Sequence, residues 1–136
     1  MSQIIVPSAL LASDINAYSD AGDARKQAFH KHGAAFLKKV ALHLNLGKGE
    51  FNIRSNQGGI AVSGEVTLHA DHLYVQLHES CLKPGIELMY RSCKGQKDCT
   101  GGPNNFVQLS QFREVHTQER VLKAMTEIIE RERESA

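Results

Sequence analysis

The sequence predicts an α+β fold, an antiparallel meander of about five strands with N-terminal and C-terminal helices packed on one face. Three observations lead to this prediction. The chain has 136 residues, 41% hydrophobic and 23% charged, which is typical of a single domain over 1-136. Apolar residues recur with helical spacing towards both ends. In the middle of the chain, apolar and polar residues alternate as they do in half-buried strands.

Two helices are expected before the strands. Residues 8–18 form a short helix with Ser8 as its cap and apolar residues along one side. Residues 24–44 have the clearest helical pattern, because their apolar side chains fall within one arc of the helical wheel. Asp23 is expected as the N-cap or as a first-turn acid, and Gly47 as the terminator.

Period-two alternation and turn residues place the strands. They are expected at residues 51–54, 60–69, 73–78, 86–93 and 106–112. Pairing Leu68 with Leu73 brings the apolar residues of the second and third strands to one face. Ala70-Asp71 is then the turn, and because this is not a preferred pair for a two-residue turn, a wider turn is the alternative.

A long loop and a final helix complete the predicted fold. Residues 94–105 carry Gly, Pro and Asn at a density that excludes regular structure, and long loops of this kind often have a function. This loop is therefore the first place to look for a partner contact. The final helix covers residues 117–133, and its core stripe contains Val121, Leu122, Met125, Ile128 and Ile129.

Charge and hydropathy exclude several classes of protein. The 16 Lys and Arg residues nearly balance 15 Asp and Glu residues, so a net charge of +1 gives no global field for nucleic acid or membranes. Apolar runs stay short of the roughly 18 residues that span a bilayer, and the N-terminus does not resemble a signal peptide. We expect a cytoplasmic protein with no cofactor. Its three cysteines are an odd number, so free thiols are expected at Cys81, Cys93 and Cys99.

The polar face of the predicted hairpin is the first candidate site. The expected register gathers Glu65, His69, His72, Tyr74 and His78 on that face, with His69 opposite His72. Together with the hydroxyls of Ser63 and Thr67 on the same face, an acid, three imidazoles and a phenol could hold a metal or act as general acids and bases. The commoner interpretation is the solvent-facing side of an antiparallel sheet.

Metal binding and covalent catalysis have weaker support. Zinc takes four N or S ligands, but Cys93 lies at the far end of a strand from the turn that holds Cys81. A zinc site made with His78 and Cys99 is therefore disfavoured, and no metal is expected. The sequence has no G-x-S-x-G motif and no phosphate-loop motif, so no catalytic residue is assigned.

Local positive charge marks the second candidate site. Residues 25–54 contain seven Lys or Arg residues against Glu50 alone, a local balance of +6. Basic residues gather on one arc of the helix, and more lie in or near the long loop. The candidate ligand-binding residues are Arg25, His32, Lys39, His43, Arg91, Lys94 and Lys97. Such a stripe beside a glycine-rich loop fits a phosphate backbone, and the alternative is an ordinary solvated helix face.

These patterns favour a small non-catalytic binding or accessory protein. Its expected partner is an anion such as nucleic acid, contacted through the basic helix edge and the 94–105 loop. One alternative is a protein–protein or self-assembly module that uses an exposed edge strand, and this leaves a protein partner or a homo-oligomer open. A further alternative is an enzyme that uses the His-rich hairpin face. No membrane partner is expected.

Overall fold

The first helix shows how local sequence builds the helical layer. The structure is a computed structural model and describes residues 3–80 and 82–135. Helix α1 (Asp20–His43) begins at Ser19, whose side chain accepts a hydrogen bond from Gly22 N at 3.0 Å. Asp23 is a first-turn acid, which suits the positive end of the helix dipole. Helix α1 ends at His43, before Gly47. The residue with a left-handed backbone that follows the helix is Asn45, with a φ of 58°.

The segment before α1 corrects one prediction. Only the 3-10 turn η1 (Ser8–Leu11) is helical, so a helix over 8–18 is wrong. Ala12 is extended, and Asp14 has a φ of 56°, which a continuous right-handed helix does not allow. The apolar residues predicted to line the helix still serve the core, since Leu10 and Ile15 are both buried.

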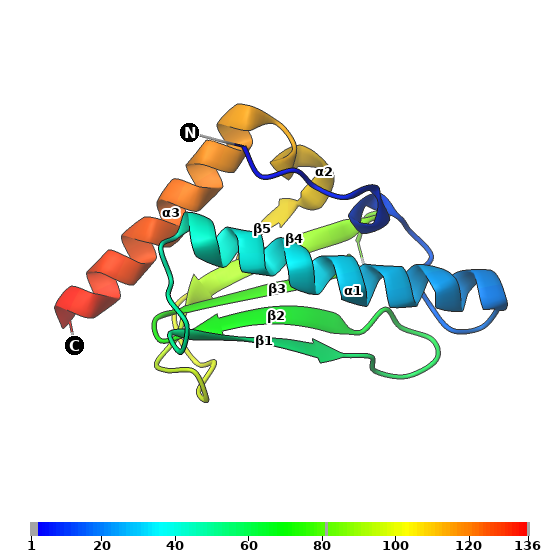
Figure 1. Ribbon diagram of the computed structural model, residues 1–136, viewed down its shortest axis with the longest axis horizontal. Coiled ribbons are helices and arrows are strands. Elements are labelled where there is room, and N and C mark those ends of the chain that lie inside the picture. Colours follow the sequence, from blue (N-terminus) through cyan, green and yellow to red (C-terminus); the bar gives the residue numbers. More distant parts are fainter. Residues whose placement is uncertain (1–2, 81, 136) are drawn as a thin grey trace.

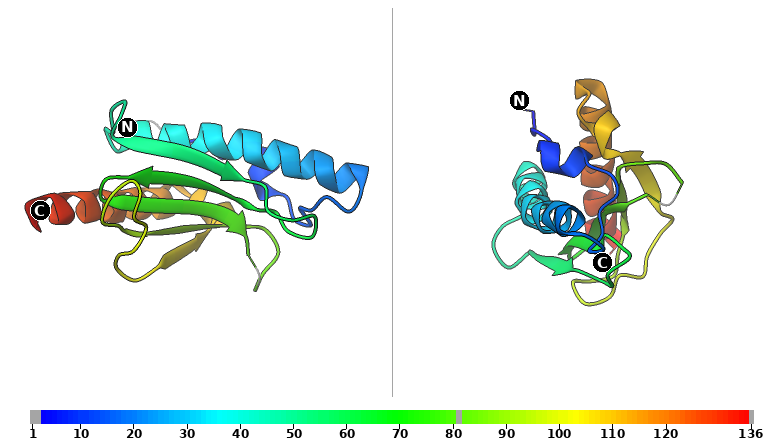
Figure 2. Two further views of the ribbon diagram at one scale, coloured as in Figure 1. Left: turned by 90° about the horizontal axis from the view of Figure 1, so that it is seen from below. Right: turned by 90° about the vertical axis from the view of Figure 1, so that its right-hand side faces the viewer.

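The sheet is the predicted meander. It has five antiparallel strands in the order in which they occur along the chain (Figures 1 and 2). The strands are β1 (Phe51–Asn56), β2 (Glu65–Ala70), β3 (Leu73–Glu79), β4 (Ile86–Ser92) and β5 (Asn105–Gln108). The α+β class and the neighbour-to-neighbour pairing are both confirmed.

The register of the β2–β3 hairpin differs from the predicted one by two residues. Leu68 pairs with Val75 rather than Leu73, and His69 pairs with Tyr74 rather than His72. The turn is accordingly Asp71-His72, not Ala70-Asp71. A slip of two residues leaves every side chain on its original face, so face assignments survive although the cross-strand partners change.

The connection between β1 and β2 corrects a second prediction. Residues 60–64, expected to be strand, belong to a loop in which Ile60 and Val62 are 62% and 51% exposed. Gly64 explains why the strand cannot extend back along the chain, because it has a φ of 71°. Two buried side chains of α1 hold the loop. Lys26 Nζ donates to Gly59 O at 2.7 Å, and His30 Nε2 lies 2.8 Å from Ser63 O.

The C-terminal part corrects a third prediction. The strand expected over 106–112 ends at Gln108, and α2 (Leu109–Phe112) follows. Leu109 and Phe112 are both fully buried, a three-residue spacing that a helical turn satisfies and a strand does not. Helix α3 (Val115–Ser135) contains the predicted final helix and buries the whole of its predicted core stripe.

Both long helices cover the apolar face of the sheet. α1 packs over β1 and β2, and α3 packs over β3 and β4, so one core runs beneath both (Figure 1). Phe36 of α1 meets Phe112 edge to face, with ring centroids 5.7 Å apart. The N-terminal segment joins α3, since Ile4 N donates to Gln118 Oε1 at 2.7 Å and Gln118 Nε2 donates back to Ile4 O at 3.0 Å. Among the described residues, no helix has the length and apolar character needed to span a membrane.

Candidate ligand-binding cavity on the polar face of the sheet

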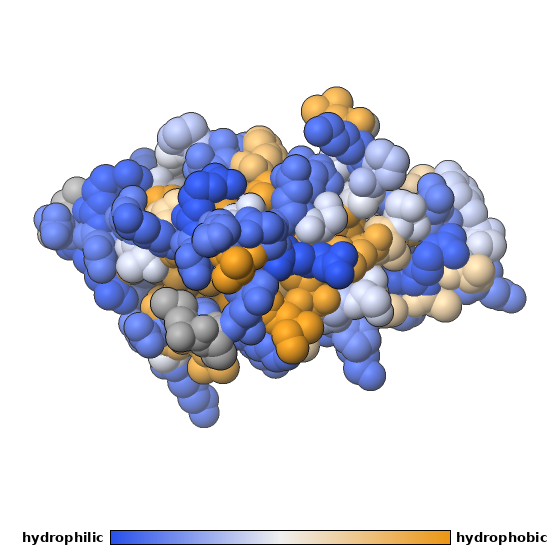
Figure 3. All heavy atoms as spheres, turned by 90° about the horizontal axis from the view of Figure 1, so that it is seen from above, coloured by the Kyte–Doolittle hydropathy of each residue, from blue (hydrophilic) through white to orange (hydrophobic). Residues whose placement is uncertain are grey.

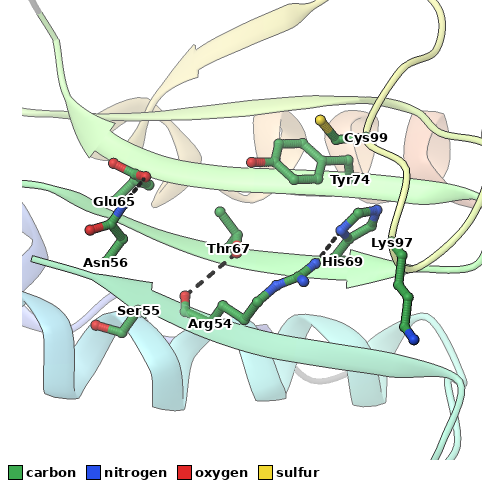
Figure 4. A pocket seen from close by; sticks show the side chains of 9 residues that line it. All are labelled: Arg54, Ser55, Asn56, Glu65, Thr67, His69, Tyr74, Lys97 and Cys99. Atoms are coloured by element: carbon green, nitrogen blue, oxygen red, sulfur yellow. Dashed lines mark hydrogen bonds between the residues drawn. The ribbon is translucent and has the colours of Figure 1, made fainter. Parts of the chain in front are cut away.

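A cavity of about 520 Å³ lies on the face of the sheet that the helices leave open (Figure 4). This volume falls within the usual range for small-molecule sites. Three adjacent strands form its floor, and the segment 93–104 between β4 and β5 forms its wall. The lining residues are Arg54, Ser55, Asn56, Glu65, Thr67, His69, Tyr74, Lys97 and Cys99.

Strand register brings these side chains together. Asn56 pairs with Glu65, and Arg54 pairs with Thr67 across β1 and β2. His69 then pairs with Tyr74 across β2 and β3. Because alternate residues of a strand share a face, every second residue of β1 and β2 presents a polar group on this side.

The loop 93–104 is tied down by Gln96 at one end of the sheet. Its Oε1 accepts from Asn52 Nδ2 at 2.5 Å, and its Nε2 donates to Gly49 O at 3.0 Å and Asp71 Oδ1 at 2.9 Å. Gly101 lies so close to β4 that an added Cβ would stand 1.8 Å from Ser92 O. These contacts hold the cavity wall in place without regular secondary structure.

Arg91 of β4 makes a second attachment of the same loop. Its Nε donates to Cys99 O at 3.0 Å, and its Nη1 donates to Asn104 Oδ1 at 2.8 Å. The guanidinium carbon also lies 4.9 Å from the centroid of the Tyr74 ring, a cation–π contact. Arg91 therefore joins the loop to the aromatic side of the cavity.

Arg54 fixes the protonation state of His69. One nitrogen of the guanidinium, Nη2, contacts His69 Nδ1, and it also donates to Gln96 O at 3.1 Å. A guanidinium can only donate, so Nδ1 must accept and the imidazole carries its proton on Nε2. Burial lowers the pKa of His69, and the positive charge of Arg54 lowers it further. His69 is therefore a neutral acceptor on β2 that orients Arg54, and Arg54 in turn contacts the loop.

The cavity contains charges that have no ionic partner. Arg54 and Lys97 make no ion pair with any residue in the part of the chain that the structure describes. Glu65 also lacks one there, and its Oε1 accepts only a hydrogen bond from Asn56 Nδ2 at 3.0 Å. Figure 4 shows the arginine side chain directed towards His69, with Glu65 at the opposite end of the cavity.

The predicted polar face is only partly assembled in the cavity. Glu65, His69 and Tyr74 line it, whereas His72 and His78 do not. His72 lies in the β2–β3 turn, and His78 Nε2 is 3.0 Å from Glu87 Oε1. The three imidazoles therefore do not converge, and the expected His69–His72 pair is wrong because the register differs.

The basic residues fall into two groups on opposite sides of the sheet. One group lies along α1, which covers the apolar face, and contains Arg25, His32, Lys39 and His43. The other contains Arg91, Lys94 and Lys97, of which the last lines the cavity and Lys94 is exposed. The structure does not join the two groups into one surface.

The basic edge of α1 is itself divided. Arg25 donates twice to Asp14 O, at 3.2 and 3.0 Å, near the start of the helix. Lys39 and His43, near its end, line a separate shallow hollow with apolar Ile5 and Leu42. Figure 3 shows hydrophobic patches among mostly hydrophilic atoms in the view from above. This edge is therefore not a uniform phosphate-binding stripe.

The two cysteines that the structure describes, Cys93 and Cys99, belong to no group of potential metal ligands. Cys81 lies outside the described residues. Cys93 is buried and donates from Sγ to Ala70 O at 3.2 Å, and burial raises the pKa of its thiol. Cys99 is exposed at the cavity. Over residues 3–80 and 82–135, no group of three His, Cys, Asp or Glu side chains could hold a metal ion.

Three lining residues were not named as candidates from the sequence. Arg54, Ser55 and Asn56 all belong to β1. The alternation over 51–54 could have placed Arg54 on the polar face, but its relation to the loop depends on how the loop folds back.

Comparison of the chain with protein-family models, with curated proteins and with solved structures found no match. Its function is therefore inferred from its own residues.

Proposed function

We propose that this protein is a non-catalytic binding protein that holds an anionic ligand in the cavity on the polar face. The observation that supports the proposal most directly is the placement of Arg54 and Lys97. Both line the cavity, and neither has an ionic partner among the described residues. A cation that faces a cavity without a counter-ion is well placed to bind a carboxylate or a phosphate group.

The surroundings of Arg54 favour the same ligand class. Its Nη2 is engaged by His69 and Gln96, which orients the guanidinium, while Nε and Nη1 make no hydrogen bond with the described residues. A neutral His69 places no second charge beside it. An oriented guanidinium loses less side-chain entropy when it binds an oxyanion than a freely rotating one does.

Nucleic acid is the larger anion expected from the sequence, and the geometry favours a small one. The basic residues of α1 and those of the loop lie on opposite sides of the sheet, so one straight phosphate backbone would not contact both. The free thiols of Cys93 and Cys99 are in keeping with the cytoplasm that we expect for the protein.

Inorganic phosphate tests the proposal. We would titrate it into ¹⁵N-labelled protein at constant ionic strength, with chloride as the balancing anion, and follow the amide shifts. Phosphate is expected to move amides at 54–56, 65–69 and 96–99. Lys97→Gln should weaken binding by about threefold to tenfold, because it removes one charge-assisted contact.

Lys94→Gln is the matched control, since Lys94 belongs to the same loop, is exposed and does not line the cavity. Its phosphate affinity should equal that of the natural protein. Equal losses in the two variants would indicate only general screening, and would contradict a site at the cavity. Oligonucleotide binding that is lost in Lys39→Glu but kept in Lys97→Glu would place the anion site on α1 instead.

A further inference from the structure

The charges of the cavity are separated along the strands. Arg54 and Lys97 lie at the end where the loop crosses the sheet, near His69, and Glu65 lies beside Asn56 at the other end (Figure 4). We propose that the cavity binds a linear zwitterion, with a carboxylate at the Arg54–Lys97 end and an amino group at Glu65, as in a short extended peptide. This inference rests on the proposed function, because it requires the same anion site.

Arg54 and Glu65 are close enough across the two strands to form an ion pair, yet they do not form one. Arg54 pairs with Thr67, so Glu65 is its diagonal neighbour across β1 and β2. Diagonal neighbours in an antiparallel pair lie about 7–8 Å apart, within reach of an arginine. Arg54 instead contacts His69 and Gln96, which lie in the opposite direction. The two opposite charges therefore remain available to a ligand rather than neutralising each other.

Both ends retain capacity for hydrogen bonds. Within the described residues, Nε and Nη1 of Arg54 and Nζ of Lys97 donate to no acceptor. Glu65 uses Oε1 for Asn56, and its Oε2 accepts nothing there. Two groups of donors at one end and a carboxylate oxygen at the other match a carboxylate and an ammonium group.

Strand geometry sets the length of the ligand. Glu65 and His69 are four residues apart on β2, which corresponds to about 14 Å in an antiparallel strand. Allowing about 3 Å for the hydrogen bond at each end leaves roughly 8 Å for the ligand. An extended peptide advances about 3.3–3.6 Å per residue, so the two steps from the first to the third residue of a tripeptide cover about 7 Å, whereas a single residue is too short.

Polar groups between the two ends suit the amides of a peptide. Thr67 Oγ1 lies on the floor, where its bond to Arg54 O is long at 3.5 Å. The Tyr74 hydroxyl accepts from Gln76 Nε2 at 3.1 Å and keeps its own hydrogen for another acceptor. An aliphatic chain would leave these groups unused.

Four related ligands test the inference on the whole protein by isothermal titration calorimetry. Trialanine carries both charges, N-acetyl-trialanine only the carboxylate, trialanine amide only the ammonium, and 8-aminooctanoic acid both charges without internal amides. We expect trialanine to bind about tenfold more tightly than either singly charged peptide, the effect of one charge-assisted contact. If trialanine binds at least about threefold more tightly than 8-aminooctanoic acid, the cavity also recognises the amides of a peptide. If these two ligands bind equally well, the cavity recognises only the two charged ends.

Two variants assign the ends. Glu65→Gln should abolish the advantage of trialanine over N-acetyl-trialanine, whereas Lys97→Gln should weaken the binding of both peptides. Glu119→Gln, an exposed acid on α3, should change neither. Equal binding of trialanine and N-acetyl-trialanine by the natural protein would overturn the zwitterion and leave the anion site standing. Failure of phosphate itself to bind would overturn both.

Discussion

Replacing Gly64 with alanine tests the connection between β1 and β2. Gly64 directly precedes β2 and has a φ of 71°, where a side chain is strained. An added Cβ would lie 2.1 Å from Asn56 O and 2.6 Å from Gln57 O. Both oxygens are backbone atoms at the end of β1, so neither can move aside alone.

The expected loss of stability has two parts. The left-handed conformation costs alanine about 1–2 kcal/mol relative to glycine. Relieving the overlap requires the ends of β1 and β2 to move apart, and forced shifts of packed groups typically cost about 1–3 kcal/mol. The free energy of unfolding should therefore fall by about 2–5 kcal/mol, a large share of the roughly 5–15 kcal/mol that holds a domain together.

Two other glycines separate these parts. Gly49 has a φ of 88° with no atom within 4 Å of an added Cβ, so Gly49→Ala should cost only the conformational part, about 1–2 kcal/mol. Gly59 has ordinary backbone and equally open space, so Gly59→Ala should stay within about 0.5 kcal/mol of the natural protein. Urea unfolding followed by far-ultraviolet circular dichroism measures all three. A Gly64→Ala protein as stable as Gly49→Ala would refute the close approach.

Three further predictions concern acid stability, the loop and the thiols. Burial lowers the pKa of His30 in the folded protein, so as pH drops below about 6.5 the unfolded chain takes up a proton that the folded protein does not, and stability falls. His30→Gln should therefore show a smaller difference than the natural protein between the urea midpoints measured at pH 7.5 and pH 5.5. Gly101→Ala should push the loop away from β4 and weaken phosphate binding by at least about threefold, while unfolding free energy changes by less than about 2 kcal/mol. In a Cys81→Ser background, a thiol reagent should label exposed Cys99 rapidly, and buried Cys93 only as fast as the protein opens locally around it. Comparable labelling rates for the two thiols would contradict the burial of Cys93.

The fold class was predictable because burial leaves a strong trace in the sequence. Alternation identified β2 and β3, since one face of each is buried and the other polar. The register was not predictable, because a slip of two residues preserves the faces and only the turn geometry distinguishes the alternatives. The alternation of Ile60 and Val62 also continues the strand pattern into a loop, and the dihedral angles of Gly64 are what interrupt it.

The cavity was less predictable than the sheet. Glu65, His69 and Tyr74 could be placed on the polar face, because a side chain's face follows from its strand position. Their meeting with Lys97 depends on the path of the loop, which Gln96 fixes through contacts with residues distant in sequence. Local sequence patterns do not encode such contacts. The sequence could therefore identify the loop as a candidate site, but could not predict which strand residues it would meet.

The pairing of Ile4 with Gln118 has a consequence for the order of folding. Each strand of the sheet neighbours the next along the chain, so the sheet grows by short loop closures that carry a small entropic penalty. The bonds between Ile4 and Gln118 instead close a loop between residues 114 positions apart. We expect this attachment to form after the hairpins and to open before them, so the Ile4 amide should exchange with deuterium sooner than the amides of β2 and β3.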